Sequence, residues 1–125
     1  MVNMKKYIWL LVLMAFVGGV VWLMRTPGKS GPLDGFAKCI KDSGAIFYGA
    51  FWCPHCQSQK AMFGVSAKYL PYIECSTPDG NNQLPICNEA GVKGYPTWKY
   101  PDGTIETGEV SLAKLSKATN CPLPQ

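Results

Sequence analysis

The chain has 125 residues, enough for one domain, and a formal net charge of +4. All of this excess lies before Ser30, because the eight lysines and eight acidic residues from Ser30 onward cancel. The part of the chain that can fold into a domain therefore lacks the basic surface of a nucleic-acid-binding protein, and we expect no nucleic-acid partner.

Residues 7–24 form an uncharged apolar run that predicts a transmembrane helix. Such a helix spans about 27 Å, close to the ~30 Å thickness of the hydrocarbon core. Lys5 and Lys6 favour a cytoplasmic N-terminus, although Arg25 and Lys29 reduce the charge difference across the run. The alternative is a signal peptide cleaved after the run, but the length of the run favours an uncleaved anchor. In both cases we expect the rest of the chain to be exported.

Residues 26–35 are rich in proline and glycine and have no apolar periodicity, which is typical of a flexible linker. We therefore divide the chain into a membrane anchor (1–25), this linker and a folded domain (36–125). A domain of about 90 residues buries little more than ~60% of its unfolded surface, so covalent cross-links add usefully to its stability.

Apolar periodicity and turn residues predict mixed α and β structure in the domain. Helix 54–68 has Met62, Val65 and Tyr69 on its apolar face, with a bend at Gly64. The predicted elements in chain order are a helix (36–42), a strand (45–51), a helix (54–68), a strand (72–75), a loop (76–83), a helix (84–90), a hairpin (97–100 and 104–107) and a helix from the Ser111 cap to near Asn120.

Cys53 and Cys56 form a C-x-x-C motif where the first strand passes into a helix. Pro54 suits the first helical position, and the orphan N–H groups and the positive end of the helix dipole point at the Cys53 sulfur. This environment favours the thiolate, which is the form that attacks disulfides. The alternatives are half a zinc site or a structural disulfide. No second Cys or His pair has matching spacing, so we favour redox chemistry and expect no metal and no cofactor.

The six cysteines of an exported chain predict a disulfide framework. With the redox pair set aside, Cys75 and Cys87 flank a loop and are easy to join, and Cys39 and Cys121 would then tie the ends of the domain together. On the chain-entropy model these bonds contribute at most about 3 and about 4–5 kcal/mol, respectively. The alternative is that some of the four are free thiols.

The chain resembles thioredoxin-fold proteins in the string FWCPHC (residues 51–56), in the helix that follows and in the string GYPTW (residues 94–98). The resemblance implies an α/β fold with a mixed sheet of about four strands flanked by helices. It also implies that Pro96 is a cis-proline against the redox pair, the alternative being an ordinary trans turn. Tyr95 would then offer its backbone to an extended peptide. Trp52 would line the substrate groove with Pro96, unless it serves only in packing.

A closer resemblance covers residues 36–122, in the cysteine spacing and in the strings FYGAFW, YLPYIEC and YPTW. It is to the thioredoxin-like domain fused to bacterial and plant homologues of vitamin K epoxide reductase. In those proteins the domain exchanges disulfides with exported substrates, and the membrane half reoxidises it with quinone. The resemblance implies Cys53–Cys56 as the active pair and agrees with both structural pairings. Because this chain has one predicted anchor and no quinone-reducing half, we expect a separate membrane redox partner.

The dipeptide Pro54-His55 resembles that of the strongly oxidising periplasmic group, in which the reduced thiolate is stabilised. We therefore expect His55 to stabilise the thiolate; the alternative is an ordinary exposed residue at the helix start. Thioredoxins carry a buried carboxylate six residues before the first active cysteine, where this chain has Phe47. Glu74, on the neighbouring strand, is a distant candidate for a proton relay and otherwise a strand-end charge.

These features predict a membrane-anchored thiol-disulfide oxidoreductase that oxidises exported cysteine-containing proteins. Its catalytic domain would lie in the periplasm, the thylakoid lumen or another exported compartment. A quinone-linked oxidase of the vitamin K epoxide reductase type would recycle it. The alternatives are a tethered reductase served by a transmembrane reductase, or a non-catalytic thioredoxin-fold binding module.

Overall fold

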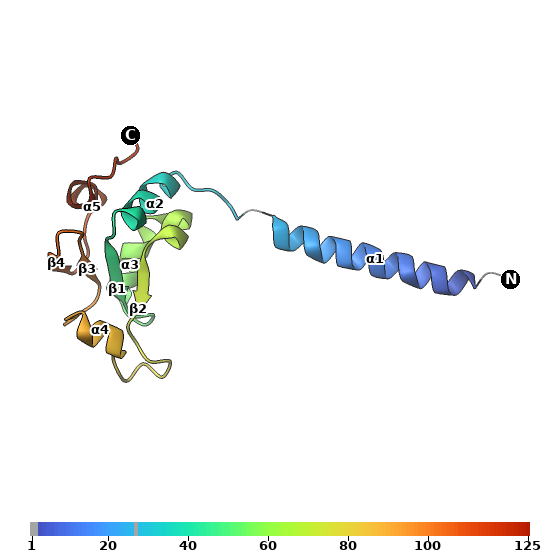
Figure 1. Cartoon of the computed structure of the whole chain (residues 1–125), viewed down its shortest axis with the longest axis horizontal. Helices are drawn as coiled ribbons and strands as arrows, with labels where there is room; N and C mark the ends of the chain where they lie inside the picture. Colours follow the sequence, from blue (N-terminus) through green and yellow to red (C-terminus); the bar gives the residue numbers. More distant parts are fainter. Residues whose placement is uncertain (1–2, 27) are drawn as a thin grey trace.

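The computed structural model describes residues 3–26 and 28–125; residues 1–2 of the expected anchor and Pro27 of the expected linker lie outside this description. Figure 1 shows one long helix and a mixed α/β domain. The elements are α1 (Met4–Arg25), α2 (Asp34–Asp42), β1 (Ile46–Gly49), α3 (Pro54–Ala61), the 3₁₀ helix η1 (Gly64–Tyr69), β2 (Tyr72–Glu74), α4 (Pro85–Glu89), β3 (Thr97–Lys99), β4 (Ile105–Thr107) and α5 (Leu112–Thr119).

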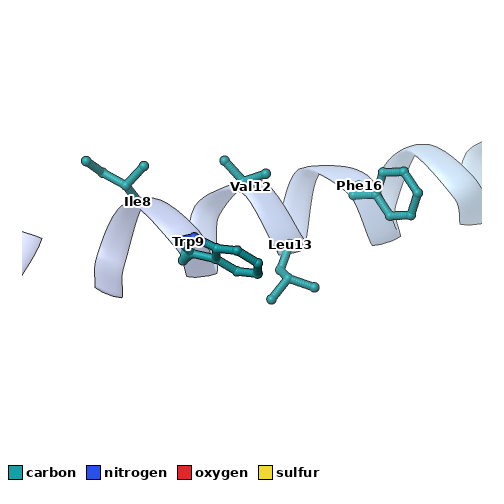
Figure 2. A pocket seen from close by; sticks show the side chains of 5 residues that line it. All are labelled: Ile8, Trp9, Val12, Leu13 and Phe16. Carbon is teal, nitrogen blue, oxygen red and sulfur yellow. The ribbon is translucent and has the colours of Figure 1, made fainter. Parts of the chain in front are cut away.

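Helix α1 stands apart from the domain and buries none of its residues (Figure 1). It is long and apolar enough to cross a membrane. A hollow on its surface is lined by apolar side chains of this one helix (Figure 2), namely Ile8, Trp9, Val12, Leu13 and Phe16. None of the cysteines borders this hollow, and its lining suits lipid chains better than a polar substrate.

The domain is built on a mixed four-stranded sheet in the order β2-β1-β3-β4. Strand β1 is parallel to β2 and antiparallel to β3, and β3 and β4 form the predicted hairpin. Phe47, at the centre of this sheet, pairs with Tyr72 on one side and Trp98 on the other. Helices flank the sheet, which gives the predicted α/β thioredoxin-like fold (Figure 1).

Aromatic rings fill the core beneath the sheet. The ring of Phe47 stacks on Trp98 at a centroid distance of 4.8 Å and meets Tyr72 edge-on at 5.2 Å. Phe47 and Trp98 are fully buried. The position where thioredoxins carry a carboxylate is therefore part of an aromatic stack in this chain.

The prediction of one helix over residues 54–68 is wrong. Helix α3 ends at Ala61, and a separate 3₁₀ helix, η1, begins at Gly64. Gly64 has a φ of +53°, a left-handed conformation that glycine adopts easily and that ends the α-helical path. The residue therefore does more than bend the helix.

The apolar face predicted for that helix is also wrong, because the break changes the helical phase. Met62 and Val65 are 36% and 48% exposed, and Tyr69 is only partly buried. The side chains that point into the domain are instead Phe63 and Ser66.

The other predicted elements are present, with boundaries shifted by a few residues. The Ser111 hydroxyl accepts a hydrogen bond from the Lys114 N–H at the start of α5. Asn120 ends that helix in a left-handed conformation with a φ of +56°. Both features depend only on residues at the ends of the helix itself, so they can be predicted from the sequence.

The described residues contain two disulfides, with the pairings expected from the sequence. Cys39–Cys121 joins α2 to the segment that follows α5, and Cys75–Cys87 joins the end of β2 to α4. The first therefore connects the two ends of the domain, and the second closes a local loop.

Gln59 is a buried polar residue that sequence analysis did not single out. Its side-chain oxygen accepts hydrogen bonds from the Val110 N–H (2.7 Å) and the Trp98 indole N–H (3.3 Å), and its amide donates to the Val110 carbonyl (3.0 Å). Gln59 thus joins α3 to β3 and to the segment before α5.

Replacing Gln59 with Leu should lower the free energy of unfolding by about 2–4 kcal/mol, because several buried polar groups would lose their partners. Urea unfolding of the full chain in detergent micelles measures the change. Gln57→Leu is the matched control: Gln57 is exposed and donates one hydrogen bond to the Phe51 carbonyl, so its loss should cost less than about 1 kcal/mol. Equal costs for the two variants would contradict this view of Gln59.

Candidate functional site

Cys53 lies at the surface end of α3. It is the N-cap residue, its N–H donates to the Ala50 carbonyl at 3.0 Å, and Pro54 follows at the first helical position. Its thiol points at the Tyr95 carbonyl, with a sulfur–oxygen distance of 3.7 Å. The residue is 5% exposed, so a small part of it remains accessible.

Cys56 lies one turn further into the helix and is fully buried. Burial raises the pKa of its thiol to about 12, although the backbone of Ala50 acts in the opposite direction. Cys53 and Cys56 are not bonded to each other in this structure. An incoming sulfur can therefore approach Cys53 but not Cys56, which gives the two cysteines different chemical tasks.

Pro96 lies directly before β3, and the Tyr95–Pro96 peptide bond is cis. The Pro96 side chain is fully buried, while the carbonyl of Tyr95 faces the Cys53 sulfur. The structure thus brings Cys53 against the dipeptide Tyr95-Pro96, although Cys53 and Tyr95 are 42 positions apart in the sequence.

Trp52 and Phe51 form an exposed apolar rim beside Cys53, with 51% and 49% of their surface accessible. The indole N–H of Trp52 donates to the Ser76 hydroxyl at 2.9 Å, and its ring meets that of Tyr95 edge-on at 5.9 Å. Trp52 is therefore held in a fixed orientation and remains open to a binding partner.

His55 lies at the exposed start of α3, where its Nδ1 atom is 2.7 Å from a carboxylate oxygen of Glu109. In the described part of the chain, no hydrogen bond links His55 to Cys53 or Cys56. Sequence analysis missed Glu109, and nothing in the sequence relates two residues 54 positions apart. The imidazole is thus placed against a carboxylate near the redox pair.

Glu74 lies at the end of β2 and accepts three hydrogen bonds. The donors are the Tyr72 hydroxyl (2.7 Å), the Ser76 N–H (2.9 Å) and the Phe51 N–H (3.2 Å). With these contacts the carboxylate fixes the backbone just before the redox motif. The arrangement favours a positioning role over the proton relay considered from the sequence.

Tyr72 and Lys60 lie beside the buried cysteine, and sequence analysis singled out neither as a site residue. The Lys60 ammonium lies 3.4 Å from the centroid of the Tyr72 ring. Burial, followed by the Glu74 carboxylate, raises the pKa of Tyr72 well above its usual value, so its hydroxyl stays protonated.

Gly49 brings the Tyr72 ring and the Cys56 sulfur close to the backbone of β1. A Cβ atom at this position would lie 2.8 Å from Tyr72 Cε2 and 3.0 Å from Cys56 Sγ. Sequence analysis gave this glycine no role, although its lack of a side chain makes the close packing possible.

The remaining cysteines are disulfide-bonded, and no cluster of three or more His, Cys, Asp or Glu side chains is placed to hold a metal ion within residues 3–26 and 28–125. The candidate site therefore consists of Cys53, Cys56 and the groups that surround them.

A C-x-x-C pair at the start of a helix, facing a cis-proline just before an internal strand of a mixed sheet, defines a thioredoxin-like domain with a dithiol site. Comparison with known proteins agrees with this class. The chain is 45% identical over 94 residues to the protein named thiol-disulfide oxidoreductase LTO1 of Arabidopsis thaliana. This match covers 71% of the chain and 24% of the relative, so the chain spans about a quarter of that protein's length. No protein-family model matches the chain.

Gly49→Ala should destabilise the domain by about 1–3 kcal/mol and slow thiol exchange at the redox pair, because Tyr72 and Cys56 must move. Urea unfolding and the rate of disulfide opening by a monothiol measure the two effects. Gly35→Ala is the control, since no atom lies within 4 Å of its added Cβ and alanine favours helix α2 by up to about 1 kcal/mol. Unchanged stability and rate in Gly49→Ala would show that the close packing is unnecessary.

Proposed function

We propose that the chain is a membrane-anchored protein thiol-disulfide oxidoreductase with Cys53 and Cys56 as its redox pair. The main support is the difference in accessibility between the two sulfurs, together with the Tyr95 carbonyl that faces Cys53. The similarity to a protein named thiol-disulfide oxidoreductase supports the same chemistry.

In the oxidising direction, a substrate thiolate attacks Cys53 Sγ of the Cys53–Cys56 disulfide. A mixed disulfide forms, the bond to Cys56 breaks, and its electron pair goes to Cys56 Sγ. A second substrate thiol then attacks the substrate sulfur of the mixed disulfide. The substrate leaves oxidised and the redox pair is left reduced.

The surface beside Cys53 suits an extended polypeptide. Trp52 offers an exposed apolar face, and the Tyr95 backbone lies next to the sulfur. Backbone pairing with Tyr95 and apolar contact with Trp52 would accept many sequences, because neither depends on a particular side chain apart from the cysteine. The substrates we propose are exported proteins that contain cysteines.

We place the domain outside the cytoplasm, in the periplasm, the thylakoid lumen or another exported compartment, with α1 as a single membrane anchor and the N-terminus in the cytoplasm. Two disulfides in addition to the redox pair support this location, since such bonds persist in oxidising compartments. The length and composition of α1 support the anchor.

The preferred direction is oxidation, with the pair recycled by a separate quinone-linked membrane oxidase of the vitamin K epoxide reductase type. The dipeptide Pro54-His55 supports this direction, because it places an imidazole at the start of α3 next to the redox pair. A reductase fed by a transmembrane partner would use the same two sulfurs, so the reduction potential distinguishes the two directions.

Cys56→Ala should accumulate mixed disulfides through Cys53, because the sulfur that resolves them within the chain is missing. The variant is expressed as the full chain, and adducts are identified by mass spectrometry after thiol blocking. Cys53→Ala/Cys56→Ala is the control and should form none. A complete absence of adducts would contradict the exchange mechanism and favour a non-catalytic binding module, and adducts with cytoplasmic proteins alone would contradict the topology.

The Cys53–Cys56 couple should have a reduction potential of about −120 to −180 mV, the range of protein oxidants. Equilibration of the full chain with glutathione buffers in detergent, followed by alkylation and mass measurement, gives the value. A potential near about −270 mV, as in thioredoxin, would instead make the chain a reductase.

A further inference from the structure

The buried sulfur poses an electrostatic problem for disulfide exchange. When the Cys53–Cys56 bond opens, the leaving electron pair places a negative charge on Cys56 Sγ, inside a fully buried site. Burial strongly disfavours that charge, which is why it raises the pKa of the Cys56 thiol to about 12. The backbone of Ala50 opposes this effect, and a positive charge near Cys56 would oppose it further.

The surroundings of Cys56 do not contain the buried acid of thioredoxins. Phe47 occupies that position and stacks on Trp98. Glu74 is nearby, but its carboxylate is held by three donors and carries the wrong sign to balance a thiolate. Neither of these side chains therefore opposes the effect of burial on the Cys56 thiolate.

Lys60 is placed to supply the positive charge near Cys56. It lies four residues after Cys56 in α3, and side chains with this spacing are neighbours on one face of a helix. Its ammonium lies 3.4 Å from the centroid of the Tyr72 ring. The edge of that ring and the Cys56 sulfur border the same point on Gly49, at 2.8 and 3.0 Å from a Cβ built there. The cation, the ring and the sulfur thus form one cluster.

The Tyr72 ring explains why the lysine stays near the sulfur instead of extending into solvent. A cation over an aromatic face is attracted to it, more strongly where water is partly excluded, and Lys60 is only partly exposed. The ring is itself fixed, because its hydroxyl donates to Glu74 and its edge meets Phe47. Glu74 and Tyr72 therefore position Lys60, and the charge of Lys60 opposes the effect of burial on Cys56.

We propose that Lys60 is the positive charge that stabilises Cys56 as the leaving thiolate when a substrate opens the Cys53–Cys56 disulfide. The inference rests on the proposed function. The substrate sulfur is oxidised as it bonds to Cys53, Cys56 is reduced as it receives the electron pair, and the Cys56 thiolate then takes a proton from solvent water. Lys60 acts on the transient anion and keeps its own proton.

The experiment measures the rate at which excess 2-mercaptoethanol opens the oxidised pair in the full chain in detergent micelles. Lys60→Met keeps an apolar side chain of similar length without the charge and should be roughly 10-fold slower, because a poorer leaving thiolate departs more slowly. Lys60→Arg keeps the charge and should stay within about twofold of the parent rate.

Lys38→Met is the matched control, because the Lys38 ammonium also lies over a tyrosine, 4.3 Å from the centroid of Tyr69, away from the redox pair. Its rate should equal that of the parent chain. The equilibrium constant of the pair with glutathione should change less than twofold in all three variants, since Cys56 is protonated in the reduced product.

A parent rate in Lys60→Met would overturn the inference, and so would equal slowing in Lys60→Met and Lys60→Arg, which would indicate packing instead of charge. An equilibrium constant that falls as much as the rate would also overturn it, because the lysine would then stabilise the product. If Lys60→Met does not fold, Lys60→Gln serves the same purpose. A Cys56→Ala chain that forms no adducts through Cys53 would instead refute the proposed function itself.

Discussion

The candidate site depends on the different environments of two sulfurs, those of Cys53 and Cys56, which lie one helical turn apart. Helix α3 begins at Pro54, so Cys53 remains at the surface cap while Cys56 is carried inward against Gly49. Since side chains three residues apart lie on the same face of a helix, the two sulfurs stay close although only one is accessible. Gly49 packs against Cys56, and the Tyr95 carbonyl faces Cys53, so each sulfur has its own set of neighbours.

The core beneath the redox pair consists of packed apolar side chains instead of charged ones. Phe47 takes part in a stack with Trp98 and contacts Tyr72, so the centre of the sheet is apolar. An apolar environment stabilises the domain through buried surface but also raises the free energy of any charge placed beside it. The polar groups of the site therefore lie around this core. Glu74 holds the backbone before Cys53, and Lys60 lies above the ring of Tyr72.

Sequence analysis predicted the features that depend on neighbouring residues. The cysteine spacing, Pro54 after the N-cap and the hairpin turn are local patterns, and each appears in the structure near its predicted place. The break at Gly64 was underestimated because a glycine inside a helical pattern does not show which backbone conformation it adopts. The Gln59–Val110 and His55–Glu109 contacts join residues 51 and 54 positions apart, and no periodicity marks such pairs. They arise only when the sheet brings the segments together.

The two structural disulfides have different effects: one acts on the stability of the whole domain, and the other acts on a loop beside the site. Cys39–Cys121 ties the ends of the domain and acts on the stability of the whole fold. Cys75–Cys87 closes the segment that contains Ser76, whose hydroxyl accepts the hydrogen bond of the Trp52 indole. A loop without that bond would have more conformations available and would hold Trp52 less firmly. The local disulfide therefore helps to hold Trp52 in its orientation, because the apolar rim beside Cys53 rests on the loop that it closes.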